Sequence, residues 1–386
     1  MKKIKKISVF TSIRSEYGLL KSLLVQIKND KDFELNLIVG GAHFLDEYGN
    51  TVQEIENDGF DITFRAPFLF NDGQKDVNTR SIAALSCQIN EYFRANETDL
   101  LVVLGDRFEL LPVVTAALVL NIPIAHISGG EITEGAIDNQ VRHAISKMAN
   151  LHFVATEQFK NNLISMGEEP WRINICGELG LDEIVKLNLI QKEELFADLK
   201  LNPDLPVICA TFHTETIDNK ITPDFVDRLF NEILAKTEFQ ILVTAANFDF
   251  GGNDINRVLN RLNDVSDRIS YCKSLGKLRY FSLLNVANLV LGNSSSGLVE
   301  AKSFDIPVLN VGKRQQGRLA NINVINTSTN IDEIMGALKY ASSKEFKEEF
   351  SDTPNVYGKG NSALSITEFI KKWDKDDLLL KRTVFN

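Results

Sequence analysis

The sequence has few cysteines and histidines, and neither residue type shows the spacing of a disulfide framework or a metal site. The four cysteines lie far apart along the chain: Cys87, Cys176, Cys209 and Cys272. Isolated cysteines are typical of buried thiols in a reducing compartment, so we expect a cytoplasmic protein. The five histidines include no H-x-x-x-H pair. We therefore expect no bound metal ion.

Long apolar runs and an excess of basic residues are also missing. No stretch approaches the ~20 apolar residues of a membrane-spanning helix. The apolar stretch after the lysine-rich start breaks at Thr11, Ser12 and Arg14, so we expect neither a signal peptide nor a membrane partner. The formal charge of −10 argues against nucleic acid as a partner, because phosphate backbones recruit basic faces. Neither G-x-x-x-x-G-K-[ST] nor G-x-G-x-x-G occurs, which disfavours nucleoside triphosphatases and nicotinamide-dependent dehydrogenases.

What is present is an alternation of short apolar runs and helical patterns along 386 residues. The apolar runs lie at 7–10, 35–39, 101–104, 122–127, 151–154, 207–211, 239–244, 289–291 and 308–311. Helical patterns separate them, at 17–28, 79–94, 110–120, 139–148, 224–236, 254–262 and 298–304. This alternation predicts an α/β fold with parallel sheets.

The length exceeds that of one compact core and predicts two domains. The alternation weakens over 187–206, where Asn202-Pro203 and Leu205-Pro206 mark a connection. We expect an N-terminal domain at 1–186 and a C-terminal domain at 187–362. A last helix and tail, 363–386, has no strand after it, and we expect it to pack back on the first domain.

The segment from Leu289 to Gly297, LVLGNSSSG, joins an apolar run to a serine-rich helix start. Unpaired N–H groups at a helix start attract anions, and the hydroxyls of Ser294 and Ser295 add donors. A second apolar run leads to Lys313 and Arg314, which bring cations near the same place. The pattern predicts a diphosphate site. The alternative is that the serines only cap the helix.

A matching strand end lies in the first half, where the apolar run 100–104 leads into Gly105-Asp-Arg-Phe-Glu109. In open α/β sheets, ligands bind outside the carboxyl ends of the strands, where the strand order reverses. Asp106, Arg107 and Glu109 are therefore candidates for catalysis or substrate binding. Two such halves that face each other would bracket one ligand.

The densest polar stretch runs from His126 to His143. Two glycines after His126 allow the backbone to approach a ligand closely. Glu131 and Asp138 bring carboxylates near Arg142, an arrangement suited to proton transfer. The alternative is that Asp138 caps the following helix and pairs with Arg142 one turn later.

Other strand ends offer further candidates. Arg14 and Ser15 follow the first strand and are placed for a phosphate, although a solvated loop arginine is the alternative. His43 follows the second strand, where a histidine is more often exposed than catalytic. His213 ends the first strand of the second half and can donate to a phosphate. Asn247 ends the next strand and can bind a ribose or a base.

Taken together, several of these motifs resemble the hydrolysing UDP-N-acetylglucosamine 2-epimerases. In chain order they are Gly105-Asp-Arg107, His126-Ile-Ser-Gly-Gly-Glu131, Ile137-Asp138, Arg142-His-Ala144, Thr211-Phe-His213, Gly292-Asn-Ser-Ser-Ser-Gly297 and Gly312-Lys-Arg-Gln-Gln-Gly-Arg318. The resemblance extends from about Val9 to Arg318. It implies a GT-B fold, in which two Rossmann-like domains hold a UDP-linked sugar in an interdomain cleft. It also implies no metal or nicotinamide cofactor, and a homodimer or a dimer of dimers.

The reaction that the resemblance implies begins when UDP leaves the anomeric carbon while a base removes the C2 proton. Water then adds to the resulting 2-acetamidoglycal with inversion at C2, and N-acetylmannosamine and UDP are released. Removal of a weakly acidic C–H needs a positioned base, and an anion stabilises the cation-like anomeric carbon. The resemblance assigns the sugar side to Asp106, Glu131, Asp138, Arg142 and His43. It assigns substrate and UDP binding to Arg14, Ser15, Arg107, His213, Asn247, Ser294, Ser295, Glu300 and Arg314, with Glu300 on the ribose and the backbone of Leu275 on uracil.

One position departs from the family pattern. Many relatives carry a glutamate, and some a histidine, where this chain has Ser128. Serine cannot replace a carboxylate as a base, so we expect Glu131 or Asp106 to take that role. Together, Ser128 and the loop 133–138 resemble the corresponding segments of relatives that act on UDP-2,4-diacetamido-2,4,6-trideoxyglucose, on the legionaminic acid route. The sequence therefore leaves two substrates open, this sugar and UDP-N-acetylglucosamine.

Two further functions are compatible with the same fold. A GT-B glycosyltransferase would need an acceptor groove, for which the sequence gives no separate sign. A nucleotide-sugar sensor would keep Ser294, Ser295 and Arg314 but would have no use for several carboxylates together. The presence of Asp106, Glu131 and Asp138 therefore favours an enzyme.

Overall fold

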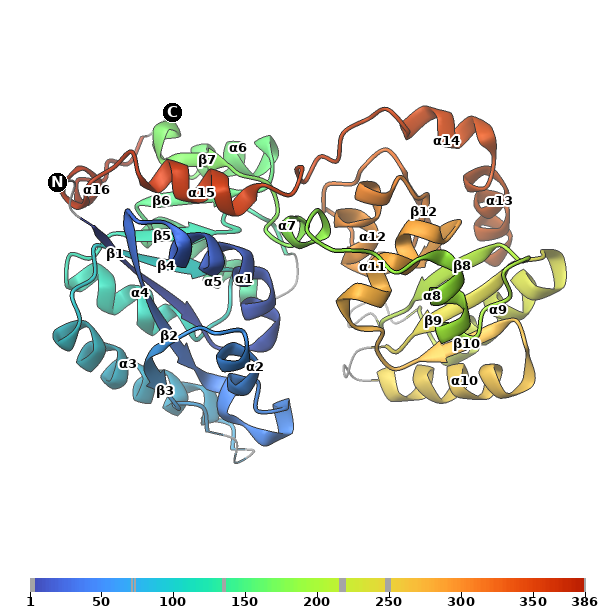
Figure 1. Ribbon diagram of the computed structural model, residues 1–386, viewed down its shortest axis with the longest axis horizontal. Helices are drawn as coiled ribbons and strands as arrows, with labels where there is room; N and C mark the ends of the chain where they lie inside the picture. The colour runs from blue at the N-terminus through green and yellow to red at the C-terminus, as the bar shows by residue number, and fades with distance from the viewer. Residues whose placement is uncertain are drawn as a thin grey trace. The chain divides into compact units, whose positions relative to one another are not determined.

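The computed structural model describes residues 4–70, 72, 74–133, 137–214, 220–246 and 251–384. The chain forms two compact units (Figure 1). The first contains Met1–Glu183 and Tyr357–Asn386, and the second contains Ile184–Val356. Among the described residues, no helix combines the length and the apolar composition that crossing a membrane would require.

The described part of the first unit contains a parallel sheet of seven strands in the order β3-β2-β1-β4-β5-β6-β7. The strands are β1 (Lys5–Thr11), β2 (Phe33–Gly40), β3 (Ile62–Ala66), β4 (Leu100–Leu104), β5 (Ile124–Ile127), β6 (Leu151–Val154) and β7 (Ile173–Ile175). The central strands are apolar almost throughout because helices cover both faces of the sheet.

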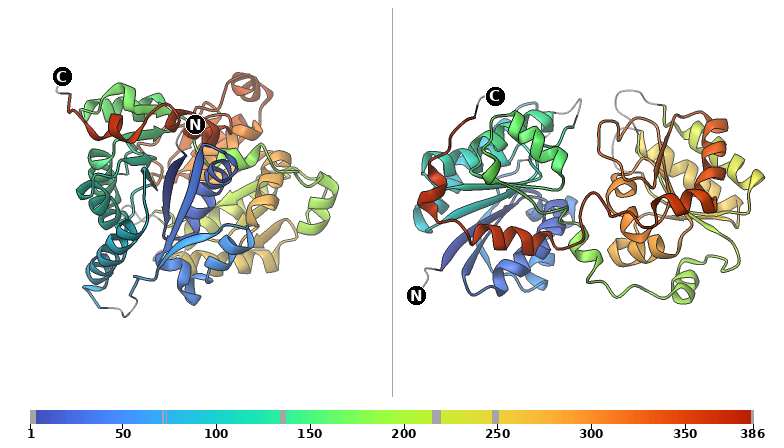
Figure 2. Two further views of the ribbon diagram at one scale, coloured as in Figure 1. Left: turned by 60° about the vertical axis from the view of Figure 1, so that its left-hand side comes forward. Right: turned by 90° about the horizontal axis from the view of Figure 1, so that it is seen from above.

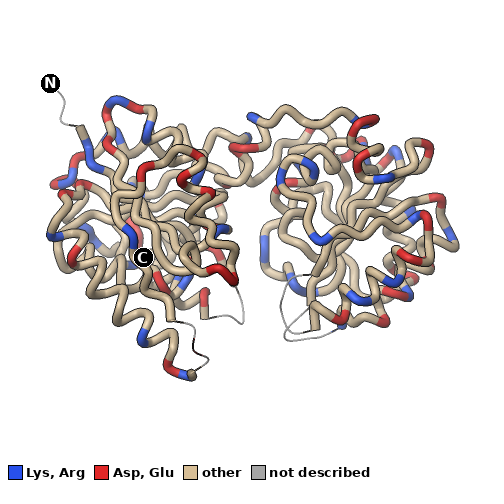
Figure 3. Tube along the Cα trace, turned by 60° about the horizontal axis from the view of Figure 1, so that its bottom comes forward, with Lys and Arg blue, Asp and Glu red and all other residues tan. Residues whose placement is uncertain are grey.

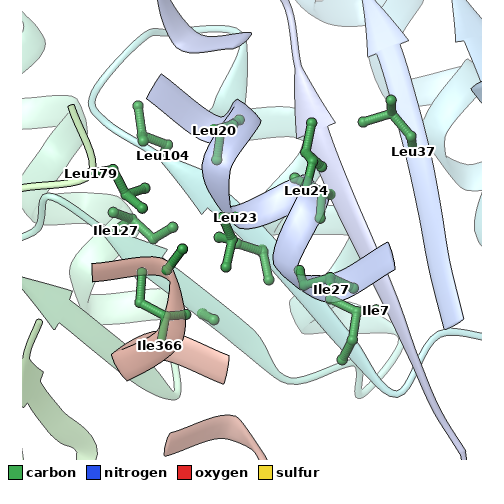
Figure 4. Packing of buried hydrophobic residues seen from close by; sticks show 14 of the residues in the cluster. Ile7, Leu20, Leu23, Leu24, Ile27, Leu37, Leu104, Ile127, Leu179 and Ile366 are labelled. Carbon is green, nitrogen blue, oxygen red and sulfur yellow. The ribbon is translucent and has the colours of Figure 1, made fainter. Parts of the chain in front are cut away.

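The helices of this unit are α1 (Arg14–Asn29), α2 (Val52–Asn57), α3 (Val77–Ala95), α4 (Leu110–Val119), α5 (Ile137–Met148), α6 (Glu157–Ser165), α7 (Leu181–Ile184), α15 (Ser362–Ile370) and α16 (Lys375–Leu379). Short 3₁₀ helices occupy Gly41–Phe44, Asp46–Tyr48 and Pro170–Arg172. Helix α15, drawn in red in Figure 2, packs against α1 although the two are more than 300 residues apart in sequence. Figure 4 shows Ile366 of α15 beside Ile127 and Leu179 in the same core.

The described part of the second unit contains a parallel sheet of six strands in the order β10-β9-β8-β11-β12-β13. The strands are β8 (Val207–Thr211), β9 (Gln240–Thr244), β10 (Ile269–Cys272), β11 (Leu289–Gly292), β12 (Val308–Val311) and β13 (Val324–Thr327). The helices are α8 (Lys192–Leu199), α9 (Pro223–Lys236), α10 (Gly252–Val265), α11 (Gly276–Val286), α12 (Ser295–Val299), α13 (Ile331–Ala341) and α14 (Lys344–Phe350), with a 3₁₀ helix at Ala301–Phe304. The predicted α/β fold with parallel sheets is confirmed.

Both sheets share one topological feature, which places the candidate residues. In the first sheet, β1 lies between β2 and β4, so the strand order reverses between β1 and β4. In the second sheet, β8 lies between β9 and β11, so the order reverses between β8 and β11. The segments that follow these strands are therefore the expected ligand-binding positions of each unit.

Candidate active site

Asp106 follows the end of β4, where the chain turns sharply. Gly105 has a φ of +88°, a backbone conformation that residues with a side chain rarely adopt. Its N–H donates to the carbonyl oxygen of Ile127 on the neighbouring strand over 3.0 Å. The turn directs the carboxylate of Asp106 to the guanidinium of Arg142, with which it forms an ion pair.

Glu131 follows β5 after a second constrained turn. Ser128 has a φ of +63°, and its N–H donates to the carbonyl oxygen of Phe153 over 2.9 Å. Gly130 also has a positive φ, and a Cβ atom there would collide with the carbonyl oxygen of Phe159. Sparsely populated backbone conformations cost free energy and tend to persist at functional sites. The turn leaves the Glu131 side chain 21% exposed.

Arg142, on α5, joins these two turns. Its side chain is only 6% exposed. One terminal nitrogen binds Asp106, and the other lies 3.9 Å from Glu131 Oε2 and donates to Thr133 Oγ1 over 3.1 Å. One buried cation thus holds two carboxylates that are 25 residues apart in sequence. The structure brings these three predicted residues together.

Asp138 and Arg107 extend this cluster. Asp138 lies in the first turn of α5, and its charge acts on Arg107. Arg107 donates to Glu109 Oε1 from Nη2 over 2.6 Å and from Nε over 3.1 Å. The ion pairs of Arg142 go to Asp106 and Glu131, so the predicted alternative of an Asp138–Arg142 pair one helical turn apart is wrong. Both carboxylates that pair with Arg142 come from turns outside its own helix, α5.

Glu16 is a buried carboxyl group that the sequence patterns did not single out. Its Oε2 accepts from the backbone N–H of Ser12 over 2.8 Å and from the Ser12 hydroxyl over 3.1 Å. Burial raises the pKa of Glu16 to about 7, although these hydrogen bonds and Arg107 act in the opposite direction. Glu16 therefore titrates in the neutral range next to the residues that follow β4. A polar residue in the first turn of a helix, as Glu16 is in α1, gives no sequence signal of this kind.

His43 lies in a 3₁₀ helix after β2 and is completely buried. Its Nε2 lies 3.1 Å from Thr11 Oγ1 and its Nδ1 lies 2.7 Å from Thr51 Oγ1. Burial lowers the pKa of His43 to about 4, so the ring is neutral at physiological pH. A buried neutral histidine between two threonines is suited to fixing the ends of β1 and β2. Its catalytic role stays a prediction.

Arg14 and Ser15 are exposed at the start of α1, directly after β1. The Nε of Arg14 lies 2.9 Å from Glu54 Oε2, and both side chains are accessible to solvent. A surface ion pair of this kind contributes little stability. Arg14 can therefore exchange Glu54 for an anionic ligand at low cost.

In the second unit, Gly292 and Asn293 form the junction between β11 and the serine-rich segment. Gly292 has a φ of +137°, and a Cβ atom there would overlap the carbonyl oxygen of Thr211. The buried Asn293 side chain binds the backbone of His213 twice, with Oδ1 accepting over 2.7 Å and Nδ2 donating over 2.8 Å. Asn293 thereby fixes His213 at the strand end next to its own.

Arg314 reaches the same junction from the segment after β12. Its Nη1 donates to the carbonyl oxygen of Asn293 over 3.1 Å, and Gln315 Nε2 donates to the same oxygen over 2.9 Å. Ser294 directly follows this carbonyl group, and its hydroxyl accepts from the N–H of Ser296. His213, Ser294 and Arg314 are thus held around one backbone position. The sequence predicted these residues but not the role of Asn293.

The serine-rich helix is shorter than expected. The sequence pattern predicted a helix that continues to Phe304, whereas α12 ends at Val299 and a 3₁₀ helix covers Ala301–Phe304. The chain then leaves the helix through Asp305, which has a φ of +48°. Tightening of the last turn into 3₁₀ geometry is common at helix ends, and apolar periodicity does not reveal it.

Glu300 lies at the end of α12 with a buried side-chain oxygen, Oε2, that has no hydrogen-bond partner. Burial raises the pKa of Glu300, and a hydrogen bond from Ser296 opposes this effect. Ser296 in turn accepts a hydrogen bond from the Tyr280 hydroxyl over 2.7 Å. Leu275 is the buried residue that precedes α11, and the following Gly276 has a positive φ. The predicted residue Asn247 lies outside the described residues.

Charged residues of both signs occur throughout the described parts of both units. Figure 3 shows basic and acidic residues interspersed along the chain in each unit. Among the described residues, no group of three His, Cys, Asp or Glu side chains is arranged to hold a metal ion. The independence of the protein from metals stays a prediction.

The chain is similar to proteins of one known family. The model of the UDP-N-acetylglucosamine 2-epimerase family matches residues 25–371. A Campylobacter jejuni relative named GDP/UDP-N,N'-diacetylbacillosamine 2-epimerase (hydrolyzing) is 36% identical over 345 residues, which are 89% of each chain. A Legionella pneumophila UDP-N,N'-diacetylbacillosamine 2-epimerase (hydrolyzing) is 34% identical over 95% of this chain and 96% of its own. A Neisseria meningitidis serogroup B UDP-N-acetylglucosamine 2-epimerase is 30% identical over 91% of each chain.

Solved structures show the same fold at lower sequence identity. The UDP-GlcNAc 2-epimerase from Neisseria meningitidis bound to UDP-GlcNAc has a TM-score of 0.76 at 18% identity and covers 96% of this chain and all of its own. The Methanocaldococcus jannaschii enzyme in complex with UDP-GlcNAc and UDP has a TM-score of 0.70 at 17% identity, with 95% of this chain and all of its own covered. These matches confirm the predicted GT-B-like α/β fold. The chain belongs to the UDP-N-acetylglucosamine 2-epimerase family.

Proposed function

We propose that this protein is a hydrolysing 2-epimerase that converts a UDP-linked 2-acetamido sugar into UDP and the free sugar inverted at C2. The observation that carries the proposal is the buried Arg142, which holds the carboxylates of Asp106 and Glu131 together. Binding of a nucleotide sugar alone does not need two carboxylates around one cation. Proton transfer at carbon requires a positioned base, and either of these carboxylates can supply one.

The first half of the proposed reaction is an elimination. Glu131 or Asp106 takes the proton from C2, the C1–O bond breaks, and its electron pair leaves with UDP. In the second half, water supplies a hydroxyl group to C1 and a proton returns to C2 from the opposite face. Arg142 keeps the two carboxylates in place during both steps. Ser128 has no acidic group, so it does not compete for this role.

The second unit would bind the UDP that leaves. His213, Ser294, Ser295 and Arg314 offer hydrogen-bond donors and a positive charge to the diphosphate. Glu300 would accept from the ribose hydroxyls through its unpartnered Oε2. Asn247 and the backbone of Leu275 remain candidates for the nucleoside. Arg14, Ser15 and Arg107 are the candidates on the first unit.

Two sugars are candidate substrates. UDP-N-acetylglucosamine is the substrate in the names of the Neisseria meningitidis relative and of several structural neighbours. The Campylobacter and Legionella relatives, which have higher identity to this chain, are named for N,N'-diacetylbacillosamine, a 2,4-diacetamido-2,4,6-trideoxy sugar. This difference in identity favours the diacetamido sugar. The same elimination and hydration apply to both.

The direct test is to incubate the protein with each UDP-sugar separately and to follow the products by NMR. We expect free UDP and a free sugar with the manno configuration at C2 from at least one of them. UDP release that requires an added acceptor would instead indicate a glycosyltransferase. Tight binding of both UDP-sugars with no product would indicate a sensor.

A further inference from the structure

His126 lies one strand away from Asp106 and is completely buried on β5. Its Nε2 lies 2.7 Å from the carbonyl oxygen of Gly105, and its Nδ1 lies 3.0 Å from Ser146 Oγ on α5. A carbonyl oxygen can only accept, so Nε2 carries the proton. In the neutral ring, Nδ1 then accepts from the Ser146 hydroxyl. Both ring nitrogens are satisfied in a single tautomer.

The surroundings keep this ring neutral. Burial lowers the pKa of His126 to about 3, and the nearby charges of Arg142 and of His152, when protonated, act in the same direction. The hydrogen bond to Gly105 opposes this shift but is weaker. His126 therefore offers one N–H donor, and no net charge, throughout the physiological pH range.

The N–H of His126 holds the backbone of Gly105 from a second side. The Gly105 N–H is bound to Ile127, and its carbonyl oxygen is bound to His126, so both polar groups of the residue are held. Gly105 has the positive φ that sets the direction of Asp106. A rotation of the Gly105 carbonyl group would change the backbone dihedrals on either side of the next peptide and move the Asp106 carboxylate away from Arg142.

The same histidine and serine also support the turn that carries Glu131. A Cβ atom on Gly129 would lie 2.9 Å from Ser146 Oγ and 3.0 Å from His126 Nδ1, so the backbone at Gly129 lies directly against this pair. The turns before Asp106 and Glu131 therefore rest on one buried hydrogen-bonded pair. Neither His126 nor Ser146 is on the exposed surface.

We propose that His126, with its tautomer fixed by the Gly105 carbonyl group and its ring held by Ser146, is a positioning residue that aligns Asp106 and Glu131 for the C2 proton transfer. The proposal rests on the proposed epimerase function. His126 acts through Gly105 and through the Gly129 turn and does not itself exchange protons with the substrate. A histidine that only fills the core would make no difference to the rate beyond its effect on folding.

Two substitutions separate these roles. In His126→Gln, the side-chain amide nitrogen occupies the place of Nε2 and can still donate to Gly105. In His126→Asn, the amide reaches only to the place of Nδ1, so the Gly105 carbonyl loses its donor. Both variants remove the ring and leave a polar amide in its place, so they serve as matched controls for each other. Ser146→Ala removes the hydroxyl group that binds Nδ1 and holds the ring in place.

The experiment measures kcat and KM for UDP release, together with the thermal unfolding midpoint, for the wild type and all three variants. We expect His126→Asn to lower kcat by ~100-fold, as a misplacement of about 1 Å does, with little change in KM. We expect His126→Gln to restore most of this rate. Equal losses in both amide variants, in proportion to their loss of stability, would overturn the proposal. Unchanged kcat in His126→Asn would do so as well.

A measurement on the wild type alone gives an independent check. Long-range ¹H–¹⁵N correlation should show His126 as the Nε2–H tautomer without titration between pH 5.5 and 8.5. A protonated ring or the Nδ1–H tautomer would contradict the proposal even if the amide variants fail to fold. If the wild type has this tautomer but releases no UDP from either sugar, the proposed function fails rather than the geometry of His126.

Discussion

Asp106→Asn is the substitution that tests the carboxylate cluster most selectively. Asparagine keeps the shape of the side chain and removes its charge. Arg142 would then lose its ion pair with Asp106 and keep Glu131 Oε2 at 3.9 Å and the hydrogen bond to Thr133. The geometry around the turn is otherwise preserved, because the Gly105 N–H remains bound to Ile127 and the Gly105 carbonyl oxygen remains bound to His126.

The structure sets the expected size of the effects of Asp106→Asn on stability and on turnover. Loss of one partner from a fully buried ion pair costs about 3–5 kcal/mol. Here Asp106 is 22% exposed and Arg142 retains a second carboxylate, so we expect a smaller loss of about 1–2 kcal/mol in the free energy of unfolding. Loss of a general base or of its alignment lowers turnover by ~10²- to 10⁴-fold. The affinity for UDP should change little, because Asp106 is not among the residues proposed to bind UDP.

The assay combines UDP release at saturating UDP-sugar, UDP binding by calorimetry and chemical denaturation. Glu157→Gln is a suitable control, since Glu157 is 63% exposed in the first turn of α6 and pairs with Lys160 three residues later. We expect the control to behave as the wild type in all three measurements. Near-normal turnover of folded Asp106→Asn would refute the assignment of Asp106 to the reaction.

Three further predictions concern other parts of the two units. Arg314→Ala should weaken UDP binding by ~10- to 100-fold, which is the loss expected for a charge-assisted hydrogen bond. The control Arg228→Ala, on the exposed face of α9, should leave UDP binding unchanged. Equal UDP affinities of the two variants would show that Arg314 is not part of the site. Gly292→Ala should lower the free energy of unfolding by at least ~2 kcal/mol, because Gly292 has a positive φ and a Cβ atom there would overlap Thr211. The control Gly336→Ala on α13, where a Cβ atom would meet open space, should be neutral or stabilising. Glu16→Gln should flatten the pH dependence of stability. The unfolded chain releases this proton near pH 4.5 and the native protein only near pH 7, so the wild type loses up to about 3 kcal/mol as the pH rises through this window. An unchanged pH profile of the unfolding midpoint in Glu16→Gln would contradict the raised pKa.

The sequence predicted the interior strands of both sheets but not the edge strands. The apolar runs correspond to β1, β2, β4, β5 and β6 in the first unit and to β8, β9, β11 and β12 in the second. The strands without such a run, β3, β7, β10 and β13, are the outermost strands of the two sheets. An edge strand is only partly buried, so alternating or polar residues such as Arg65 and Asn326 are tolerated there. Continuous hydrophobicity therefore reveals only the strands that have neighbours on both sides.

The candidate site was predictable where it depends on strand ends. Asp106, Glu131 and Ser294 each follow an apolar run closely, and the parallel topology brings such positions to one edge of a sheet. The roles of the supporting residues were not predictable in this way. His126, Ser146 and Asn293 act through partners from distant segments, and their spacing in sequence carries no pattern. The catalytic and binding roles of the predicted residues stay predictions.

The most direct test of the central claim, that the carboxylates exchange the proton on C2, is turnover in deuterated water. The released sugar is isolated and its C2 position is examined by NMR. The proposed elimination and hydration predict one solvent deuteron at C2 in essentially every product molecule, together with free UDP. A sugar that is released with the original hydrogen still on C2 would contradict the mechanism.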